Sequence, residues 1–284
     1  MSIRYTERIY LISQEHEYEL QEYFAAHEFC DFFIESFKDQ SPVLKIYLPV
    51  DSDEHEYLTF LDSLELECTS KKETLEQDWL KAWLDTLEAF ELSPGVWVNP
   101  FPEEKLEKPE AELIMNIVPG TAFGTGLHST TRLAASLMEK QQLQGKSLLD
   151  VGCGTGILAL LGHFRGAQNI VAVDDDTMAI VKAKETFKQN GAPNITAYAS
   201  DLLKEVPAQK FDIVVANIIC EVLLLLLADE KLKVIAPPGT PIIFSGISDK
   251  KKAQMDKALA EAGVELLNQG HEGDWNSYAF SFKN

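Results

Sequence analysis

The stretch LLDVGCGTGILAL, residues 148–160, decides the fold of the second half of the chain. Its apolar beginning is typical of a buried strand that ends near Asp150. Gly152, Gly154 and Gly156 then allow the backbone to turn tightly and bring a ligand against bare N–H groups at the start of a helix. The motif therefore predicts a strand, a ligand-binding turn and a helix in a doubly wound α/β domain.

The glycine spacing and two acidic side chains indicate the kind of ligand. Asp174 follows Gly156 by 18 residues, at the end of the next expected strand, where its carboxylate can accept hydrogen bonds from both ribose hydroxyls. Dinucleotide enzymes favour G-x-G-x-x-G, but the position of the third glycine is Ile157 here. Asp150 would repel a pyrophosphate and tolerates the ammonium of a methionine moiety. The pattern resembles the S-adenosylmethionine loop of class I methyltransferases, so we expect that cofactor rather than a nicotinamide nucleotide.

Strands and helices alternate on both sides of this turn. The expected order is strand 146–151, helix 157–165, strand 169–174, helix 177–190, strands 195–199 and 211–216, helix 221–234 and strand 241–244. The apolar strands favour a mostly parallel, Rossmann-like sheet. Residues 264–267 and 278–282 show no helix between them, so we expect them to finish the sheet as an antiparallel hairpin.

The first 70 residues predict a separate, smaller α+β domain. Strands are expected at 3–12, 29–37, 43–50 and 64–69, with helices at 14–27 and 51–61. The order β-α-β-β-α-β is that of a ferredoxin-like domain. We expect domains at 1–70 and 113–284, joined by residues 71–112. That connection should hold a helix at 73–90, with Trp79 and Trp83 as packing anchors, and a proline-rich linker at 92–111.

The charge is concentrated in the first part of the chain. The sequence has 45 acidic and 25 basic side chains, and residues 1–110 hold 26 and 9 of them, a net charge of −17. Capture of a nucleic-acid backbone depends on Lys and Arg, so no nucleic-acid partner is expected. A basic partner fits better, although an acidic surface can also serve solubility alone.

Cysteine usage and hydropathy bear on compartment. The four cysteines are far apart and form no C-x-x-C pair, which argues against a metal site or a redox motif. The longest apolar run, residues 222–228, is too short to span a bilayer, and the N-terminus lacks a signal-peptide core. We expect a cytoplasmic protein with no metal and no membrane contact.

Two further strand ends carry candidate site residues. Asp201 follows the third strand, where an acid can face the adenine amino group; an ordinary helix N-cap is the other interpretation. Asn217 ends the fourth strand in VVANII, and its amide oxygen could orient an acceptor amine for attack. Enzymes that methylate base amines usually have Pro-Pro and an aromatic residue after this position, whereas Ile-Ile-Cys follows here. A nucleic-acid base is therefore disfavoured as the acceptor.

A second glycine-rich loop, PGTAFGTGLHSTTRL at residues 119–133, precedes the motif. Alone it is compatible with a loop over a cofactor or with a capped helix entrance. Together with LLDVGCGTGIL and VVANII it resembles the PrmA-type methyltransferase family, which modifies large-subunit ribosomal protein eleven. The similarity extends to DWLKAW at 78–83 and SGI at 245–247, and spans about 70% of the chain.

The resemblance implies an N-terminal recognition domain tethered to a class I catalytic domain that methylates lysine side-chain or terminal amines of that ribosomal protein. The cofactor contacts it implies are Thr131, Gly152, Asp174 and Asn217. The chain departs from the family pattern mildly: Leu127 and Ser129 flank the loop histidine where Thr and Pro are usual, and Ile219 replaces a usual Leu.

A neutral amine must attack the sulfonium methyl, so a lysine with an ordinary pKa of about 10.4 has to lose its proton first. Burial beside a positive charge lowers that pKa, and no dedicated general base is required. His128 can be a proton acceptor or a helix cap. Asn217 is the candidate catalytic residue.

The acidic N-terminal region should attract a basic ribosomal protein and repel exposed ribosomal RNA. We therefore expect the free protein to be preferred over assembled subunits. Two alternatives stay open: an enzyme acting on another protein or a small-molecule amine, and a binding module that senses the cofactor without catalysis.

Overall fold

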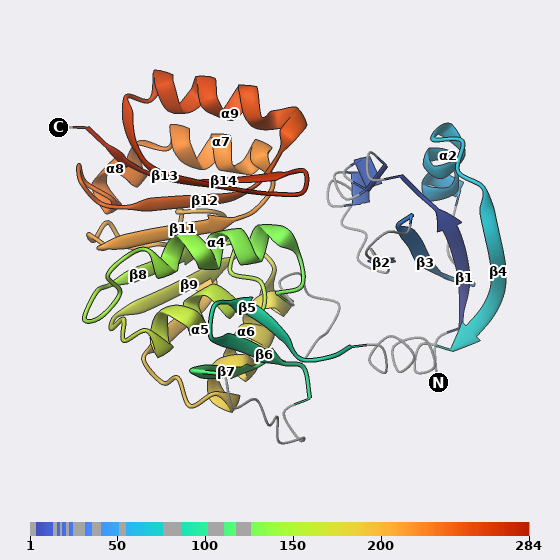
Figure 1. Cartoon of the computed structure of the whole chain (residues 1–284), viewed down its shortest axis with the longest axis horizontal. Coiled ribbons are helices and arrows are strands. Elements are labelled where there is room, and N and C mark those ends of the chain that lie inside the picture. The colour runs from blue at the N-terminus through green and yellow to red at the C-terminus, as the bar shows by residue number, and fades with distance from the viewer. Residues whose placement is uncertain are drawn as a thin grey trace. The chain divides into compact units, whose positions relative to one another are not determined.

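The computed structural model divides the chain into two compact units, Met1–Leu87 and Glu88–Asn284. It describes residues 4–13, 16–17, 19–20, 23–24, 32–35, 41–50, 55–75, 87–101, 111–117 and 126–283. Figure 1 shows the elements of each unit. Among the described residues, no helix combines the length and the apolar character needed to cross a membrane.

The first unit contains a four-stranded antiparallel sheet in the order β2-β3-β1-β4. Its elements are β1 (Arg4–Leu11), β2 (Phe32–Glu35), β3 (Val43–Pro49), α2 (His55–Ser63) and β4 (Cys68–Leu75). The core forms where apolar side chains of β1 and β3, such as Tyr10 and Ile46, pack with Leu61 of α2 and the helical residues Leu20 and Phe24. This strand order confirms the ferredoxin-like prediction.

The last strand of this unit differs from the prediction. We expected a strand at 64–69 and a helix from residue 73, but Leu64 and Glu65 form a turn and the strand runs to Leu75. Its sequence, CTSKKETL, is too polar to suggest a strand. It lies at the edge of the sheet, where charged side chains are common, and Lys72 forms an ion pair with Glu7 of β1 at 2.9 Å. Trp79 and Trp83 lie outside the described residues.

A small sheet occupies part of the expected linker. Its strands, in the order β5-β6-β7, are β5 (Phe90–Ser93), β6 (Val96–Asn99) and β7 (Leu113–Asn116). Pro94 and Gly95 form the turn of the β5–β6 hairpin, and Gly95 has a φ of +79°. Val96, Val98 and Met115 are buried in the core of the second unit. The linker prediction for residues 90–99 is therefore wrong, because Pro94 belongs to a hairpin turn inside a packed sheet.

The main sheet of the second unit has seven strands in the order β10-β9-β8-β11-β12-β14-β13. These are β8 (Leu148–Val151), β9 (Ile170–Asp174), β10 (Ile195–Ala199), β11 (Ile213–Asn217), β12 (Ile242–Ser248), β13 (Val264–Glu272) and β14 (Trp275–Phe282). The first five are parallel, and β14 is antiparallel to both of its neighbours. The predicted mostly parallel sheet with a terminal antiparallel hairpin is confirmed.

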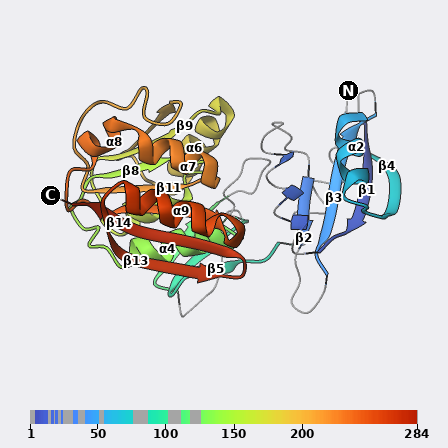
Figure 2. The same cartoon turned by 90° about the horizontal axis from the view of Figure 1, so that it is seen from above.

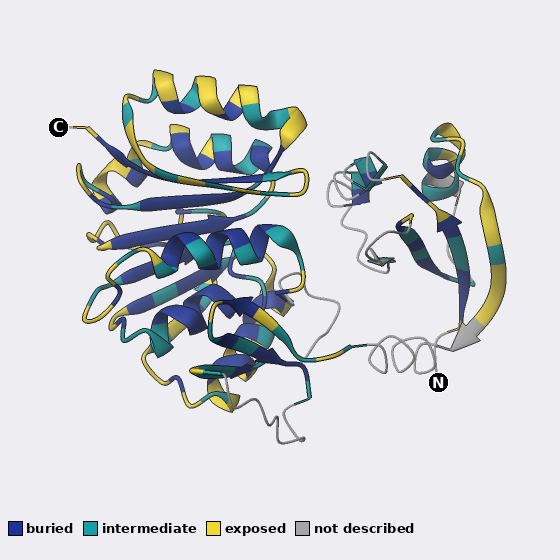
Figure 3. Cartoon of the chain, viewed as in Figure 1, coloured by how far each residue is buried: buried dark blue, intermediate teal, exposed yellow. Residues whose placement is uncertain are grey.

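Helices cover both faces of this sheet, as Figures 1 and 2 show. One face carries α4 (Ser129–Glu139), α5 (Ile157–Phe164) and α6 (Thr177–Gln189); the other carries α7 (Cys220–Ala228), α8 (Glu230–Ile235) and α9 (Asp249–Glu261). Two helices depart from the expectation. The expected helix 221–234 is divided at Asp229, whose side chain caps α8, and α9 was not predicted. Figure 3 shows the buried strands between these exposed outer helix faces.

Candidate cofactor and active site

The turn after β8 is built from three glycines, and at two of them the surrounding side chains leave no room for a Cβ. Gly152, Gly154 and Gly156 all have positive φ angles, of +71°, +53° and +79°. A Cβ on Gly152 would lie 2.3 Å from Cγ2 of Ile218, and one on Gly156 would lie 2.4 Å from the ring of Phe187. The turn therefore brings bare backbone to the carboxyl edge of the sheet, directly before α5, as the sequence predicted.

Asp150 lies beneath this turn and is 1% exposed. Its Oδ2 accepts a hydrogen bond of 3.0 Å from the Ala159 N–H of α5, whereas its Oδ1 is buried and has no hydrogen-bond partner among the described residues. Burial, and to a smaller extent the nearby Asp174, raises the pKa of Asp150 from its ordinary 3.8 to about 7, against the lowering effect of the Ala159 hydrogen bond. A buried oxygen left free in this way can accept a hydrogen bond from a cation that enters the site.

Asp174 holds the turn from the neighbouring strand. Its Oδ2 accepts a hydrogen bond of 2.8 Å from the Gly154 N–H, and its Oδ1 accepts one of 3.1 Å from the Asp176 N–H. Burial raises the pKa of this carboxyl group, and the two backbone hydrogen bonds oppose that effect. The side chain stands at the end of β9, where we expected it. Its contact with ribose hydroxyls stays a prediction.

Asn217 and Thr131 meet across 86 positions of sequence. The Asn217 amide donates a hydrogen bond of 3.2 Å from Nδ2 to Oγ1 of the buried Thr131. Because the NH₂ group is engaged in this way, the amide oxygen is the atom left for a ligand, and no residue in the described part of the chain forms a hydrogen bond with it. The two residues that resemblance had placed at the cofactor thus form one hydrogen-bonded unit.

The SGI segment, residues 245–247, holds the backbone beside Thr131 and Asn217 in place. Ser245 of β12 donates a 2.7 Å hydrogen bond from Oγ to the carbonyl of Thr130, and its own carbonyl accepts one of 3.2 Å from the Ile218 N–H. Gly246 has a φ of +96°, and a Cβ there would lie 2.2 Å from the carbonyl oxygen of Ile218. The three separate motifs STT, ANII and SGI therefore pack directly against one another.

His128 is a helix cap. Its Nδ1 accepts a 3.3 Å hydrogen bond from the Thr130 N–H at the start of α4, and its ring meets Trp275 edge to face at 4.8 Å. Burial, together with the positive charge of Arg132, lowers the pKa of His128 to about 4. Of the two interpretations left open by the sequence, the structure supports the cap.

Asp201 lies apart from this group. Its carboxylate is exposed and forms an ion pair with Lys204, and the residues after it form turns rather than a helix. The alternative of a helix N-cap is therefore wrong, while its contact with adenine stays a prediction. Leu127 and Ile219, two departures from the family pattern, are 40% and 39% exposed.

One pocket gathers most of the predicted residues. It is lined by Thr131, Asp150, Gly152, Cys153, Gly154, Ile157, Leu158 and Asn217. Gly156 is the N-cap residue of α5 beside this pocket. Asp174 contacts the pocket lining through its hydrogen bond with the Gly154 N–H. Sequence reasoning missed the wall formed by Cys153, Ile157 and Leu158, although all three lie within the decisive motif. In the described part of the chain, no cluster of three or more His, Cys, Asp or Glu side chains could hold a metal ion.

S-adenosylmethionine fits these groups. The cofactor carries two positive charges and a nucleoside, and the site offers an unpaired buried carboxyl oxygen, an unpaired amide oxygen and a bare glycine turn. The strand order and this site define a class I S-adenosylmethionine-dependent methyltransferase. Residues 12–283 match the family described as "Ribosomal protein L11 methyltransferase (PrmA)". The chain therefore belongs to the ribosomal protein L11 methyltransferase family.

Individual relatives agree with this assignment. A ribosomal protein L11 methyltransferase of Thermotoga petrophila is 37% identical over 273 residues, which cover 96% of this chain and 97% of that protein. The one of Thermosipho melanesiensis is 33% identical over 282 residues, 99% of this chain and all of the relative. A crystal structure of ribosomal protein L11 methylase from Lactobacillus delbrueckii subsp. bulgaricus is similar with a TM-score of 0.64 and 31% identity, over 70% of this chain and all of that one.

Proposed function

We propose that this protein transfers methyl groups from S-adenosylmethionine to amines of ribosomal protein L11, on lysine side chains, at the terminal amine or at both. The names of relatives that match nearly the whole chain support the substrate, as does membership of the family. The acidic N-terminal region, with its net charge of −17 over residues 1–110, suits a basic protein partner. Action on a ribosomal protein also agrees with a cytoplasmic location.

The observation that carries the amine assignment is the state of Asn217. Its Nδ2 is held by Thr131, so its unpaired Oδ1 is fixed as an acceptor at the edge of the cofactor pocket. A neutral amine can donate an N–H to this oxygen and keep its lone pair for attack. The bound cofactor supplies a methyl group attached to a positively charged sulfur. The lone pair of the amine attacks this methyl group and displaces the sulfur. Asn217 thus orients the acceptor nitrogen.

The other residues bind the cofactor. We assign the free oxygen of Asp150 to the ammonium of the methionine moiety, the turn of Gly152, Gly154 and Gly156 to close backbone contact, and Asp174 to the ribose. Asp201 is assigned to the adenine end. No general base is needed at the nitrogen, since burial near a positive charge favours the neutral amine. His128, whose Nδ1 caps α4, is assigned a structural role.

The assignment is tested by following the transfer of labelled methyl groups to purified, unmethylated L11, with the modified residues located by mass spectrometry. Methyl groups on L11 lysines or its terminal amine would support the proposal. Tight cofactor binding with no transfer to L11 would contradict it. Transfer to a small amine in preference to L11 would favour the small-molecule alternative, and retained cofactor binding without any turnover would favour the sensor.

Free L11 and assembled large subunits are compared in the same assay. We expect free L11 to be methylated faster at physiological salt, because the acidic chain is repelled by exposed ribosomal RNA. Faster methylation of assembled subunits would show that the charge does not select between the two forms.

A further inference from the structure

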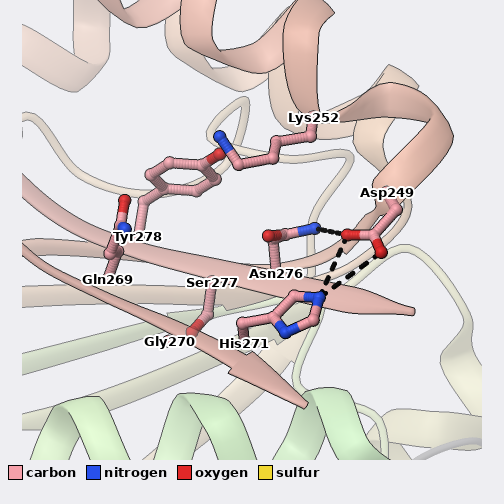
Figure 4. A pocket seen from close by; sticks show the side chains of 8 residues that line it. All are labelled: Asp249, Lys252, Gln269, Gly270, His271, Asn276, Ser277 and Tyr278. Atoms are coloured by element: carbon pink, nitrogen blue, oxygen red, sulfur yellow. Dashed lines mark hydrogen bonds and ion pairs between the residues drawn. The ribbon is translucent and has the colours of Figure 1, made fainter. Parts of the chain in front are cut away.

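A second cavity, of about 400 Å³, lies on the α9 side of the β13–β14 hairpin. Its walls are formed by Asp249 and Lys252 of α9, Gln269 and His271 of β13, and Asn276 and Tyr278 of β14. Gln269 pairs with Tyr278 and His271 with Asn276 in the sheet register, so these side chains share one face. Figure 4 shows them converging from the three elements. The proposed chemistry uses none of them.

Hydrogen-bond acceptors dominate the Asp249 end of this cavity. Asp249 Oδ1 accepts a 2.6 Å hydrogen bond from Nδ2 of Asn276, and His271 Nε2 lies 3.2 Å from the same oxygen. The amide oxygen of Asn276 is consequently turned away from Asp249, as Figure 4 shows. The hydrogen bond from Asn276 is the main cause that lowers the pKa of Asp249, so this half-exposed carboxylate is ionised at neutral pH.

The positive charge in the cavity is already compensated. Lys252 Nζ lies 2.6 Å from Asp256 Oδ2, and the Tyr278 hydroxyl donates a 2.7 Å hydrogen bond to Oδ1 of the same carboxylate. Within the described residues, the side chain of Asp249 contacts the imidazole of His271 and the neutral amide of Asn276, and the ammonium of Lys252, which is paired with Asp256, acts on it from further away. A cavity with an available carboxylate, an amide oxygen and a compensated ammonium favours a cationic ligand.

The sheet register places this cavity near the proposed acceptor site. Asn217 of β11 pairs with Ser245 of β12, and Asp249 follows Ser245 by four residues at the same carboxyl edge. With a rise of about 3.3 Å per residue, Asp249 stands roughly 10–15 Å from Asn217. An extended peptide covers that distance in about three to five residues.

We propose that this cavity is an exosite, which binds a lysine or arginine side chain of the protein substrate about three to five residues from the amine that is methylated. The inference rests on the proposed function, because it requires a basic protein substrate that crosses the carboxyl edge of the sheet. Asp249 receives the charge, and the Asn276 amide oxygen accepts a second hydrogen bond. The exosite selects which amine reaches Asn217.

The test compares Asp249→Asn with a matched control, Asp274→Asn. The control removes the same charge from an exposed position in the adjoining hairpin turn, outside the cavity lining. For Asp249→Asn we expect KM for unmethylated L11 to rise about tenfold, the effect of one charged hydrogen bond, with kcat and cofactor affinity unchanged. L11 variants that each lack one basic residue near the methylated amine then identify the residue that binds Asp249. With one of these variants, wild type and Asp249→Asn should have the same KM.

Equal KM values for Asp249→Asn and Asp274→Asn would overturn the exosite, as would an Asp249→Asn effect that persists with every substrate variant. If wild type binds the cofactor but does not methylate L11, the proposed function fails by itself. The exosite is then judged with N-acetyl-arginine amide, titrated while the Asn276 side-chain amide signal is followed by NMR. A shift in wild type that is lost in Asp249→Asn supports it, and no shift in wild type refutes it.

Discussion

Replacing Asp150 with Asn should stabilise the protein while weakening its cofactor site. Asp150 is 1% exposed, and burial is the main cause that raises its pKa from 3.8 to about 7. Asn has nearly the same shape, and its oxygen can still accept the Ala159 hydrogen bond. The substitution removes the cost of holding an ionisable carboxyl group in a dry site, so the free energy of unfolding without cofactor should increase.

The magnitude follows from the difference between the folded and unfolded pKa. Raising the pKa from 3.8 to about 7 corresponds to a cost of about 4 kcal/mol, at about 1.36 kcal/mol for each tenfold change in the ionisation constant. The folded pKa is raised, so the contribution of Asp150 to stability is fully present below pH 3.8 and is lost as the pH rises to about 7. The gain from Asp150→Asn should therefore be about 2–3 kcal/mol larger at pH 8 than at pH 5.

Urea unfolding of the cofactor-free protein at the two pH values measures this gain, and calorimetry at pH 8 measures cofactor affinity. Asp212→Asn is a control of opposite sign, because hydrogen bonds from Ser147 lower the pKa of that exposed carboxyl group. It should destabilise the protein at neutral pH. The reasoning is refuted if Asp150→Asn is less stable than wild type at pH 8, if its gain does not depend on pH, or if its cofactor affinity is unchanged.

Three further substitutions test the acceptor site. Asn217→Ala should lower kcat about 100-fold in steady-state assays, more than it weakens cofactor binding, because the amine loses its orienting oxygen; an unchanged kcat would exclude that role. Thr131→Val should lower kcat about tenfold, since the Asn217 amide is no longer held, and should add little to Asn217→Ala in the double variant. Gly246→Ala combines positive-φ strain with a Cβ 2.2 Å from the Ile218 carbonyl oxygen, whereas Gly239→Ala has strain but no atom within 4 Å. Thermal unfolding should show the first to be about 2 kcal/mol less stable than the second, and equal losses would contradict the clash.

The catalytic fold could be predicted because its decisive signals are local. The positive φ angles after β8 favour glycine, and short apolar runs mark the central parallel strands, such as IVAV in β9 and IVVA in β11. Helix α9 escaped prediction for the opposite reason. Only Met255 and Leu259 of its 13 residues are buried, so its sequence shows almost no apolar periodicity. The β5–β7 sheet was missed because prolines that punctuate a linker also form hairpin turns.

The candidate site could be predicted as a set of residues but not as a geometry. Local sequence indicates a strand end at Asn217 and a helix start near Thr131, but nothing in the sequence shows that the two side chains meet. The unpaired oxygen of Asp150 is also a product of packing, because α5 covers one carboxyl oxygen and leaves the other inside the pocket. Sequence periodicity does not indicate which side chains tertiary packing will bring together.

The position of β14 has a consequence for biosynthesis. This strand, Trp275–Phe282, lies between β12 and β13 and pairs with both, although both precede it in the chain. During translation, β12 has no partner on that side until residue 282 has left the ribosome. The earlier strands can assemble from β10 to β12 as they emerge, but the edge of β12 stays open until β14 has been made. Until then this edge is open to pairing with another chain, and a chain truncated before β14 would keep it exposed and be prone to aggregate.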